Sequence, residues 1–315
     1  MTAATHRMAG LPAKQRREGL PPPLSLWASA AGLVVLLVAG LFAAPLFAPT
    51  PFPTEGDSQF YSEQLTKLDR QVRDLKAKGE NPLSIVFVGT SRMKNAAFES
   101  DMVAKSARKA GVVRPVASTF IGINWGGFER LKPAIDMLGE RRPDAVIMMP
   151  ELLYEDLGYT ARVRIFFRYL QSKLWGQRYS LFGDREYYIE ACSGFANPVE
   201  TRMSQHREWI ATDEKGAGPR LARNMVRTLA DQGMLVVIAD VPTTGAMVKA
   251  RAEAPPSEMA ARSGFSALTN VRIERISSLP DAVYCDWAHM NPQRAGLWQG
   301  TLLGRIAADL NRPQG

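Results

Sequence analysis

Histidine and cysteine are scarce in this chain. Its 315 residues include three histidines and two cysteines. Neither cysteine has a second cysteine at metal-ligand spacing, which argues against a thiolate–metal centre. The sequence also lacks Gly-x-Gly-x-x-Gly and a phosphate-binding loop, so it carries no signature of a bound nucleotide. We therefore expect no metal and no cofactor.

Charge is missing from one long segment near the N-terminus. Leu24–Leu46 contains no charged residue, and a helix of this length reaches about 35 Å, enough to cross a bilayer. Basic residues precede the segment and Trp27 lies near its start, so the positive-inside rule places the N-terminus in the cytoplasm. A cleaved signal peptide is the alternative, although its apolar core is normally shorter. We expect a single-pass protein of the bacterial inner membrane with a periplasmic C-terminal domain.

A strong surplus of basic residues is also absent. The net charge is +8, which predicts no nucleic-acid partner. A weak preference for acidic partners, such as uronic-acid polymers or anionic lipid head groups, stays open. In the periplasm Cys192 and Cys285 could form a disulfide. The sequence does not show whether their Cα atoms come within reach of each other.

The chain divides into four parts by composition. Residues 1–23 form a polar, basic cytoplasmic tail, and 24–47 form the anchor. Residues 48–80 combine a proline-rich linker with an amphipathic helix over 58–78, where apolar residues recur every three or four positions. Residues 81–315 form one α/β domain, with a less regular insertion at about 151–212.

Short apolar runs alternate with helical segments across this domain. Strands are predicted at Leu83–Val88, Pro115–Ile121, Asp144–Met149, Leu235–Ala239 and Ala282–Cys285. Helices are predicted at about 95–110, from Gly126-Gly127 through Leu138, at 220–232, over most of 256–277, and at 292–311. This alternation predicts a three-layer, flavodoxin-like α/β fold, with a parallel five-stranded sheet covered by helices on both faces.

Two groups of residues suited to nucleophilic catalysis follow predicted strands. Ser91 follows the first strand in Gly89-Thr90-Ser91, and Asp286-x-x-His289 follows the last. A serine hydroxyl needs a nearby base, and the base needs a group that fixes its tautomer. Because strand ends of a parallel sheet share one edge, Ser91, His289 and Asp286 could meet there. Each motif alone also has a structural explanation, since Gly-x-Ser suits a strand-to-helix turn and Asp-x-x-His can be a local polar pair.

The order and placement of these motifs resemble the SGNH/GDSL superfamily of esterases and acyltransferases. Gly89-Thr90-Ser91 matches its first block, the Gly122–Gly127 loop its oxyanion block, and Asp286-Trp-Ala-His289 its last block. The resemblance implies that the Ser91 N–H stabilises the oxyanion together with Gly126 or Gly122. The family's third block normally supplies an Asn, but Met149-Pro-Glu151 stands here. Asn124 is a candidate replacement.

Four further residues are candidates for substrate binding. Arg92 is either a helix-surface residue or a clamp for an anionic substrate group. Trp125 and Trp287 could stack on a sugar or simply cover the site, and Glu151 could orient Arg92, contact substrate or be a plain loop carboxylate. His206 is expected outside the site. The aromatic, basic stretch 159–188 suits a helix at the membrane surface, a lid, or buried packing.

The resemblance implies an esterase or O-acyltransferase that acts on acyl groups, acetyl above all, of a cell-envelope polysaccharide. Anchored members of the superfamily often work with a multipass membrane acyltransferase, which is therefore a candidate partner. The alternative is a catalytically inactive envelope protein of the same fold that binds a glycan or an assembly partner.

Overall fold

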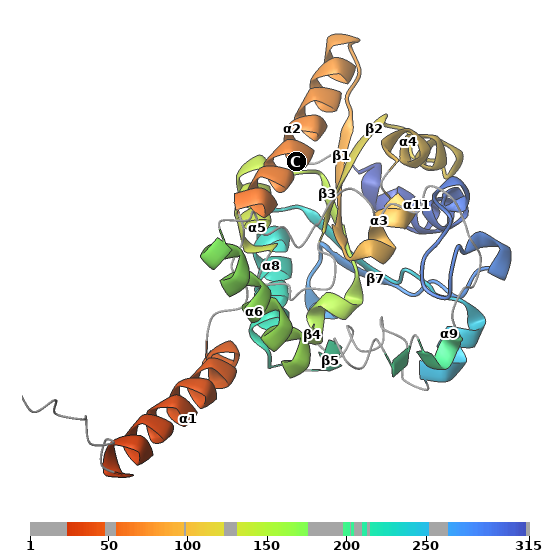
Figure 1. Ribbon diagram of the computed structural model, residues 1–315. Helices are drawn as coiled ribbons and strands as arrows, with labels where there is room; N and C mark the ends of the chain where they lie inside the picture. The colour runs from red at the N-terminus through yellow and green to blue at the C-terminus, as the bar shows by residue number, and fades with distance from the viewer. Residues whose placement is uncertain are drawn as a thin grey trace, which may run out of the picture. The chain divides into compact units, whose positions relative to one another are not determined.

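Figure 1 shows a computed structural model of the chain. It describes residues 24–47, 55–97, 99–122, 131–175, 198–201, 203–204, 210–212, 215–251 and 264–312. The chain forms two compact units that divide after Ala44. The first contains most of helix α1 (Leu24–Phe47). Its stretch Leu26–Ala44 is long and apolar enough to cross a membrane, and no other helix among the described residues meets that criterion.

The second unit is built on a sheet of five parallel strands in the order β2-β1-β3-β6-β7. The strands are β1 (Leu83–Gly89), β2 (Val116–Gly122), β3 (Ala145–Met148), β6 (Leu235–Ala239) and β7 (Val271–Glu274). The first four are almost entirely buried, as their unbroken apolar runs predict. This is the predicted α/β class, and its strand order is that of flavodoxin-like sheets.

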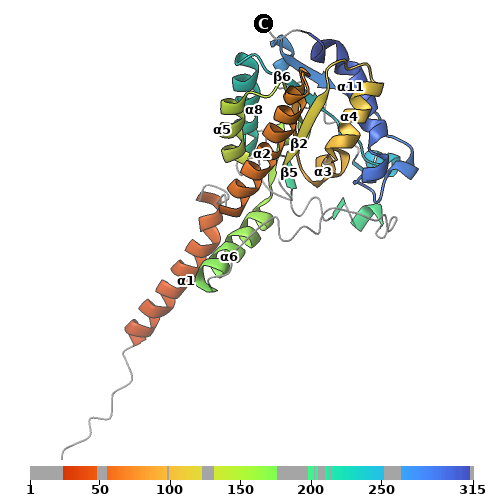
Figure 2. The same ribbon diagram turned by 90° about the horizontal axis from the view of Figure 1, so that it is seen from above.

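Helices cover both faces of the sheet (Figures 1 and 2). One face carries α2 (Glu55–Ala77), α5 (Lys132–Arg141) and α8 (Ala217–Asp231). The other carries α3 (Ser91–Ala97), α4 (Ser100–Lys109) and α11 (Gly296–Leu310). On α2 the buried residues Tyr61, Leu65 and Leu68 face the core, which confirms the predicted amphipathic helix. A continuous apolar core lies between the layers.

The insertion after β3 contains several short elements. A 3-10 turn, Pro150–Leu153, leads into β4 (Glu155–Leu157), which pairs antiparallel with β5 (Ile210–Thr212). Helix α6 (Tyr159–Trp175) follows β4.

Four short elements outside the insertion follow β6. They are α9 (Gly245–Arg251) and 3-10 turns at Phe265–Ala267, Asp281–Val283 and Pro292–Arg294.

The prediction of the fifth strand was wrong in position. Residues 282–285 form a 3-10 turn and one isolated bridge between Tyr284 and Met290. The fifth strand is β7, inside the segment predicted as a helix over 256–277. As an edge strand β7 is only partly buried and carries Arg272, whose guanidinium binds Asp309. Its mixed polarity therefore hid it from a search for apolar runs.

The helix predicted at 95–110 was also wrong in detail. Two helices, α3 and α4, occupy this region, and Glu99 between them has extended backbone angles. The break lets α3 contact the ends of β1 and β2, while α4 packs on β2 and α11.

Candidate active site

Ser91 begins α3 directly after the end of β1. A Cβ on Gly89 would lie 2.5 Å from Cβ of Met93 and 2.8 Å from Sδ of Met149. Only glycine fits at this closeness, because the helix turns back sharply onto the strand it follows. The sequence Gly-Thr-Ser thus places the Ser91 hydroxyl at the carboxyl edge of the sheet.

A short loop presents the other two candidate catalytic residues. The Cys285 N–H donates to the His289 carbonyl at 2.8 Å, next to the Tyr284–Met290 bridge. Inside the loop, the N–H groups of Ala288 and His289 donate to Asp286 Oδ1 at 2.7 and 2.8 Å. These bonds fix the loop backbone before the His289 side chain makes any contact.

The structure brings Ser91, His289 and Asp286 together. The Ser91 Oγ and His289 Nε2 atoms are 2.9 Å apart, although 198 positions separate the residues. The other ring nitrogen, Nδ1, lies 2.9 Å from Asp286 Oδ2 and 3.0 Å from Oδ1. Both ring nitrogens are therefore engaged, one by the hydroxyl and one by the carboxyl group.

The Asp286 carboxyl group is held in its ionised form. Burial acts to raise its pKa, but the hydrogen bond and charge of His289 and the two backbone N–H donors act in the opposite direction. The net effect holds the pKa of Asp286 well below its usual range. An ionised Asp286 accepts the Nδ1 proton of His289, which leaves Nε2 able to accept the Ser91 proton.

Arg92 follows Ser91 directly, and its side chain points into the protein. Its guanidinium binds Glu151 and the Val241 carbonyl oxygen, and its side chain is only 12% exposed. Burial acts to lower the pKa of Arg92, but the charge of Glu151 and the hydrogen bond to it outweigh burial, so the pKa is raised. Arg92 is thus not a helix-surface residue, and Glu151 orients it. Arg92 and Glu151 as substrate contacts stay a prediction.

Trp287 lies in the loop between Asp286 and His289. Its carbonyl oxygen accepts hydrogen bonds from the N–H and hydroxyl of the buried Thr244, both at 3.2 Å. Thr244, which follows β6 in the chain, therefore contacts the loop that carries Asp286 and His289. Thr244 and the Val241 carbonyl were not among the predicted site residues, because nothing in Val241-Pro-Thr-Thr244 indicates a contact so distant in the chain.

Gly122 ends β2 opposite Gly89, the last residue of β1. The other oxyanion candidates, Asn124 and Gly126, lie outside the described residues, as do Trp125 and His206. Cys285 is disulfide-bonded. The second cysteine of the chain, Cys192, lies outside the described residues. Within the described ranges no cluster of three or more His, Cys, Asp or Glu residues is placed to hold a metal ion.

Comparison with known proteins assigns neither activity nor substrate to the chain. No protein-family model matches it, and no curated protein matches it. It is similar to the structure of a G-D-S-L family protein from Desulfitobacterium hafniense DCB-2, with 12% identity, 71% of this chain and 98% of that chain covered, and a TM-score of 0.35. It is also similar to a family two carbohydrate esterase from Clostridium thermocellum in complex with cellohexaose, with 11% identity, 73% and 66% covered, and a TM-score of 0.28. Similarity at these TM-scores assigns no function to the chain, so the candidate site is described from its own geometry.

Proposed function

We propose that this chain is a membrane-anchored serine esterase or O-acyltransferase of SGNH type. The observation that carries the proposal is the continuous contact from Ser91 Oγ through the two ring nitrogens of His289 to Asp286. This arrangement supplies a nucleophile, a base and a group that orients the base. In a protein without a predicted cofactor, such a set is suited to acyl transfer.

The reaction proceeds through an acyl-enzyme. Ser91 Oγ attacks the acyl carbonyl carbon while its proton moves to His289 Nε2, and a tetrahedral oxyanion forms. Collapse of this intermediate breaks the bond to the leaving alcohol, which takes the proton from Nε2. A water molecule or a sugar hydroxyl then gives its proton to Nε2 and attacks the acyl group. The Ser91 ester bond breaks, and the hydroxyl recovers the proton.

Stabilisation of the oxyanion limits the rate of hydrolysis and of transfer alike, because both pass through a tetrahedral intermediate. The Ser91 N–H lies in the first turn of α3, where backbone donors have no partner within the helix. Gly122, Gly126 and Asn124 are the further candidates. The position of the third-block Asn holds Glu151, whose carboxylate binds Arg92 and cannot donate. We therefore expect weak hydrolysis, because one missing donor costs about 3–4 kcal/mol of transition-state stabilisation.

The proposed substrate is an acyl group, acetyl above all, on a cell-envelope polysaccharide. The apolar helix α1 supports attachment to the inner membrane, and the basic residues before it support a periplasmic domain. Trp125 and Trp287 are proposed to stack on sugar rings, with Arg92 and Glu151 beside the nucleophile. A multipass membrane acyltransferase is the proposed donor partner.

One observation favours an inactive glycan-binding or assembly protein as a second candidate. Glu151 in place of an Asn removes an oxyanion donor while the Arg92–Glu151 pair keeps the site folded. Such a protein would retain the contacts of Ser91 without turnover.

A fluorophosphonate probe distinguishes the two candidates. The full chain in detergent should become labelled, and Ser91→Ala should abolish labelling while the melting temperature stays unchanged. Folded wild-type protein that takes up no probe would support the inactive candidate. Release of acetate into water should then be compared with transfer to oligosaccharide acceptors. Hydrolysis unaffected by every acceptor would count against transferase activity.

A further inference from the structure

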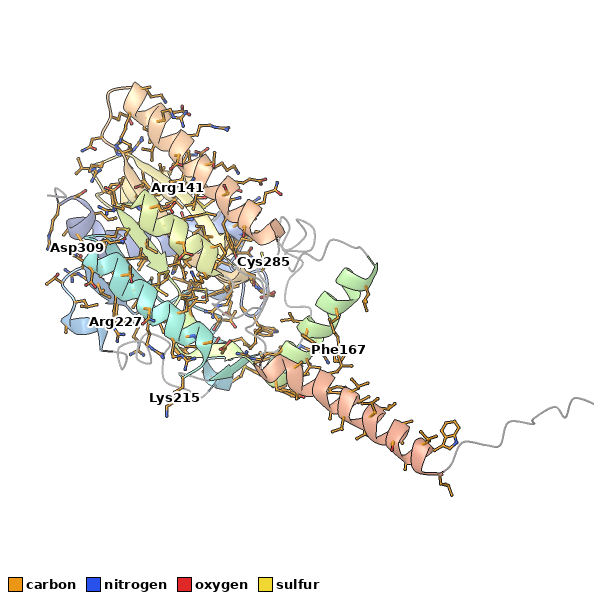
Figure 3. All side chains as sticks on the ribbon, turned by 90° about the vertical axis from the view of Figure 1, so that its left-hand side faces the viewer. Arg141, Phe167, Lys215, Arg227, Cys285 and Asp309 are labelled. Carbon is orange, nitrogen blue, oxygen red and sulfur yellow. The ribbon has the colours of Figure 1, made fainter. Side chains whose placement is uncertain are left out.

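Helix α6 attaches to the domain through one narrow apolar face. Ala161 and Ile165, one helical turn apart, are buried against Leu157 in a cluster separate from the main core. Arg162 fixes the start of the helix through Asp156, at 2.9 Å, and the Leu157 carbonyl oxygen, at 3.0 Å. The rest of α6 projects from the sheet layers (Figures 2 and 3).

A second apolar face runs along the other side of α6. We call it the α6 ridge; it consists of Tyr159, Val163, Phe166, Leu170 and Leu174. The spacing of three and four residues places these side chains on one face of the helix. At its ends Tyr159 is 49% exposed and Leu174 is 77% exposed, and the three residues between them are partly exposed. A row of exposed and partly exposed apolar side chains is typical of a surface that contacts another apolar phase.

The residue composition of α6 indicates that the apolar phase in contact with the ridge is a membrane. The helix contains four basic residues and no acidic residue in its sequence, and one of the four, Arg162, is paired with Asp156. It also carries five aromatic residues, with the Phe166 and Phe167 rings in edge-to-face contact at 5.9 Å. Basic and aromatic residues beside an apolar ridge are typical of helices that lie in the interface of an anionic membrane.

The topology places the start of α6 toward the carboxyl edge of the sheet, because the chain reaches it from the end of β3 through Pro150–Leu153 and β4. Helix α2 runs antiparallel to the sheet, since Gln64 bonds Thr119 while the later Gln71 bonds the earlier Ser118. Its first residue therefore lies toward the carboxyl edge, where β3 also leads into the insertion. Seven residues, 48–54, separate α1 from α2, and they span at most about 25 Å. The residue at which the chain enters the domain and the start of α6 therefore lie toward the same edge of the sheet.

We propose that α6 lies on the surface of an anionic membrane, with the α6 ridge inserted between the acyl chains. The proposal rests on the membrane anchoring given under the proposed function. It adds that the edge carrying Ser91 faces the bilayer. Substrates would then be reached at the membrane surface rather than in free solution.

The depth of the ridge in the bilayer tests this proposal. The full chain is reconstituted into vesicles of phosphatidylcholine, with or without phosphatidylglycerol, and an environment-sensitive fluorophore is attached at Leu174→Cys. Val113→Cys is the matched control, because Val113 is an apolar residue that is 84% exposed before β2, at the amino edge of the sheet. We expect nitroxide-labelled lipids to quench the probe at position 174 at least about threefold more than at position 113, and phosphatidylglycerol to increase this difference.

Three results of this experiment would overturn insertion of the α6 ridge into the membrane. Equal quenching at positions 174 and 113 in vesicles that retain the chain would overturn the proposal and leave anchoring intact. A blue-shifted probe at 174 that lipid nitroxides do not quench would mean that protein covers the ridge, which also overturns it. If the chain fails to float with vesicles, both anchoring and ridge insertion are wrong. Fluorophosphonate labelling of Ser91 reports the chemistry independently, so a failure of the enzyme proposal is distinguishable.

A second variant tests the ridge without moving the probe. Val163→Glu should lower quenching at position 174, whereas Val113→Glu should not change it. Circular dichroism shows whether each variant is folded, independently of any activity of Ser91. Unchanged quenching in folded Val163→Glu would contradict insertion of the ridge.

Discussion

The carbonyl oxygen of Gly89 lies only 2.2 Å from the point where a Cβ on Gly122 would stand. The two residues end neighbouring strands and face each other in register. The absence of both side chains lets the carboxyl ends of β1 and β2 approach closely at the edge where Ser91 begins its helix.

Alanine at Gly122 should therefore destabilise the domain. The added methyl group meets the Gly89 carbonyl oxygen and the Phe120 ring, at 2.2 and 2.1 Å, and such overpacking costs about 1–3 kcal/mol or more. Gly300→Ala is the control, since nothing lies within 4 Å of its added Cβ in α11. It should stabilise the helix by about 0.8–1 kcal/mol. Urea unfolding measures both, and equal effects would contradict the close approach.

Replacing Asp286 by Asn should slow the chemistry and preserve the loop. An Asn oxygen still accepts from the Ala288 and His289 N–H groups, but its amide favours the wrong tautomer of His289. The rate of fluorophosphonate labelling should fall about ten-thousandfold. Circular dichroism should show unchanged secondary structure. A variant that labels as fast as the wild type would exclude Asp286 from the catalytic group.

The Asp286 carboxyl group should also make stability depend on pH. Its folded pKa is depressed, so ionisation favours the folded state above the unfolded pKa of about 3.9. This contribution is lost as pH falls through that value toward the folded pKa. The free energy of unfolding should therefore fall more steeply below about pH 4 in the wild type than in Asp286→Asn. Chemical denaturation at a series of pH values measures the difference, and parallel curves would contradict the depressed pKa.

Removing one partner of the Arg92–Glu151 pair should be costly. Glu151 is 4% exposed and Arg92 is 12% exposed at the side chain, so Glu151→Ala leaves a buried positive charge uncompensated. The free energy of unfolding should fall by about 3–5 kcal/mol.

The double variant Arg92→Met with Glu151→Leu is the matched control, because it removes both charges and keeps the volume. Its stability should be close to that of the wild type. If the double variant is as unstable as Glu151→Ala, the hydrogen bonds of the pair stabilise the fold beyond the mutual compensation of the two charges. Labelling of Ser91 in the double variant also reveals whether Arg92 contacts the substrate.

The strands that sequence analysis located best are those buried on both faces. Leu235–Ala239 was predicted with its observed bounds, and β1 differs from the prediction by one residue. In contrast, β7 was missed because an edge strand mixes Arg272 and Glu274 with apolar residues. An apolar run in the sequence indicates a buried segment. It therefore predicts buried strands well and misses strands that are partly exposed.

The amino-acid sequence by itself identified the candidate catalytic residues and the sheet class, because Ser91 follows a buried apolar strand and few histidines in the chain could serve as its base. Only the tertiary structure decided which groups hold them in place. Thr244, the Val241 carbonyl and Glu151 reach the site from the ends of β6 and β3, and hydrogen bonds between strand ends depend on how the chain crosses over the sheet. A local sequence pattern does not show which strands become neighbours in the sheet. These hydrogen-bond partners can therefore be identified only from the folded structure.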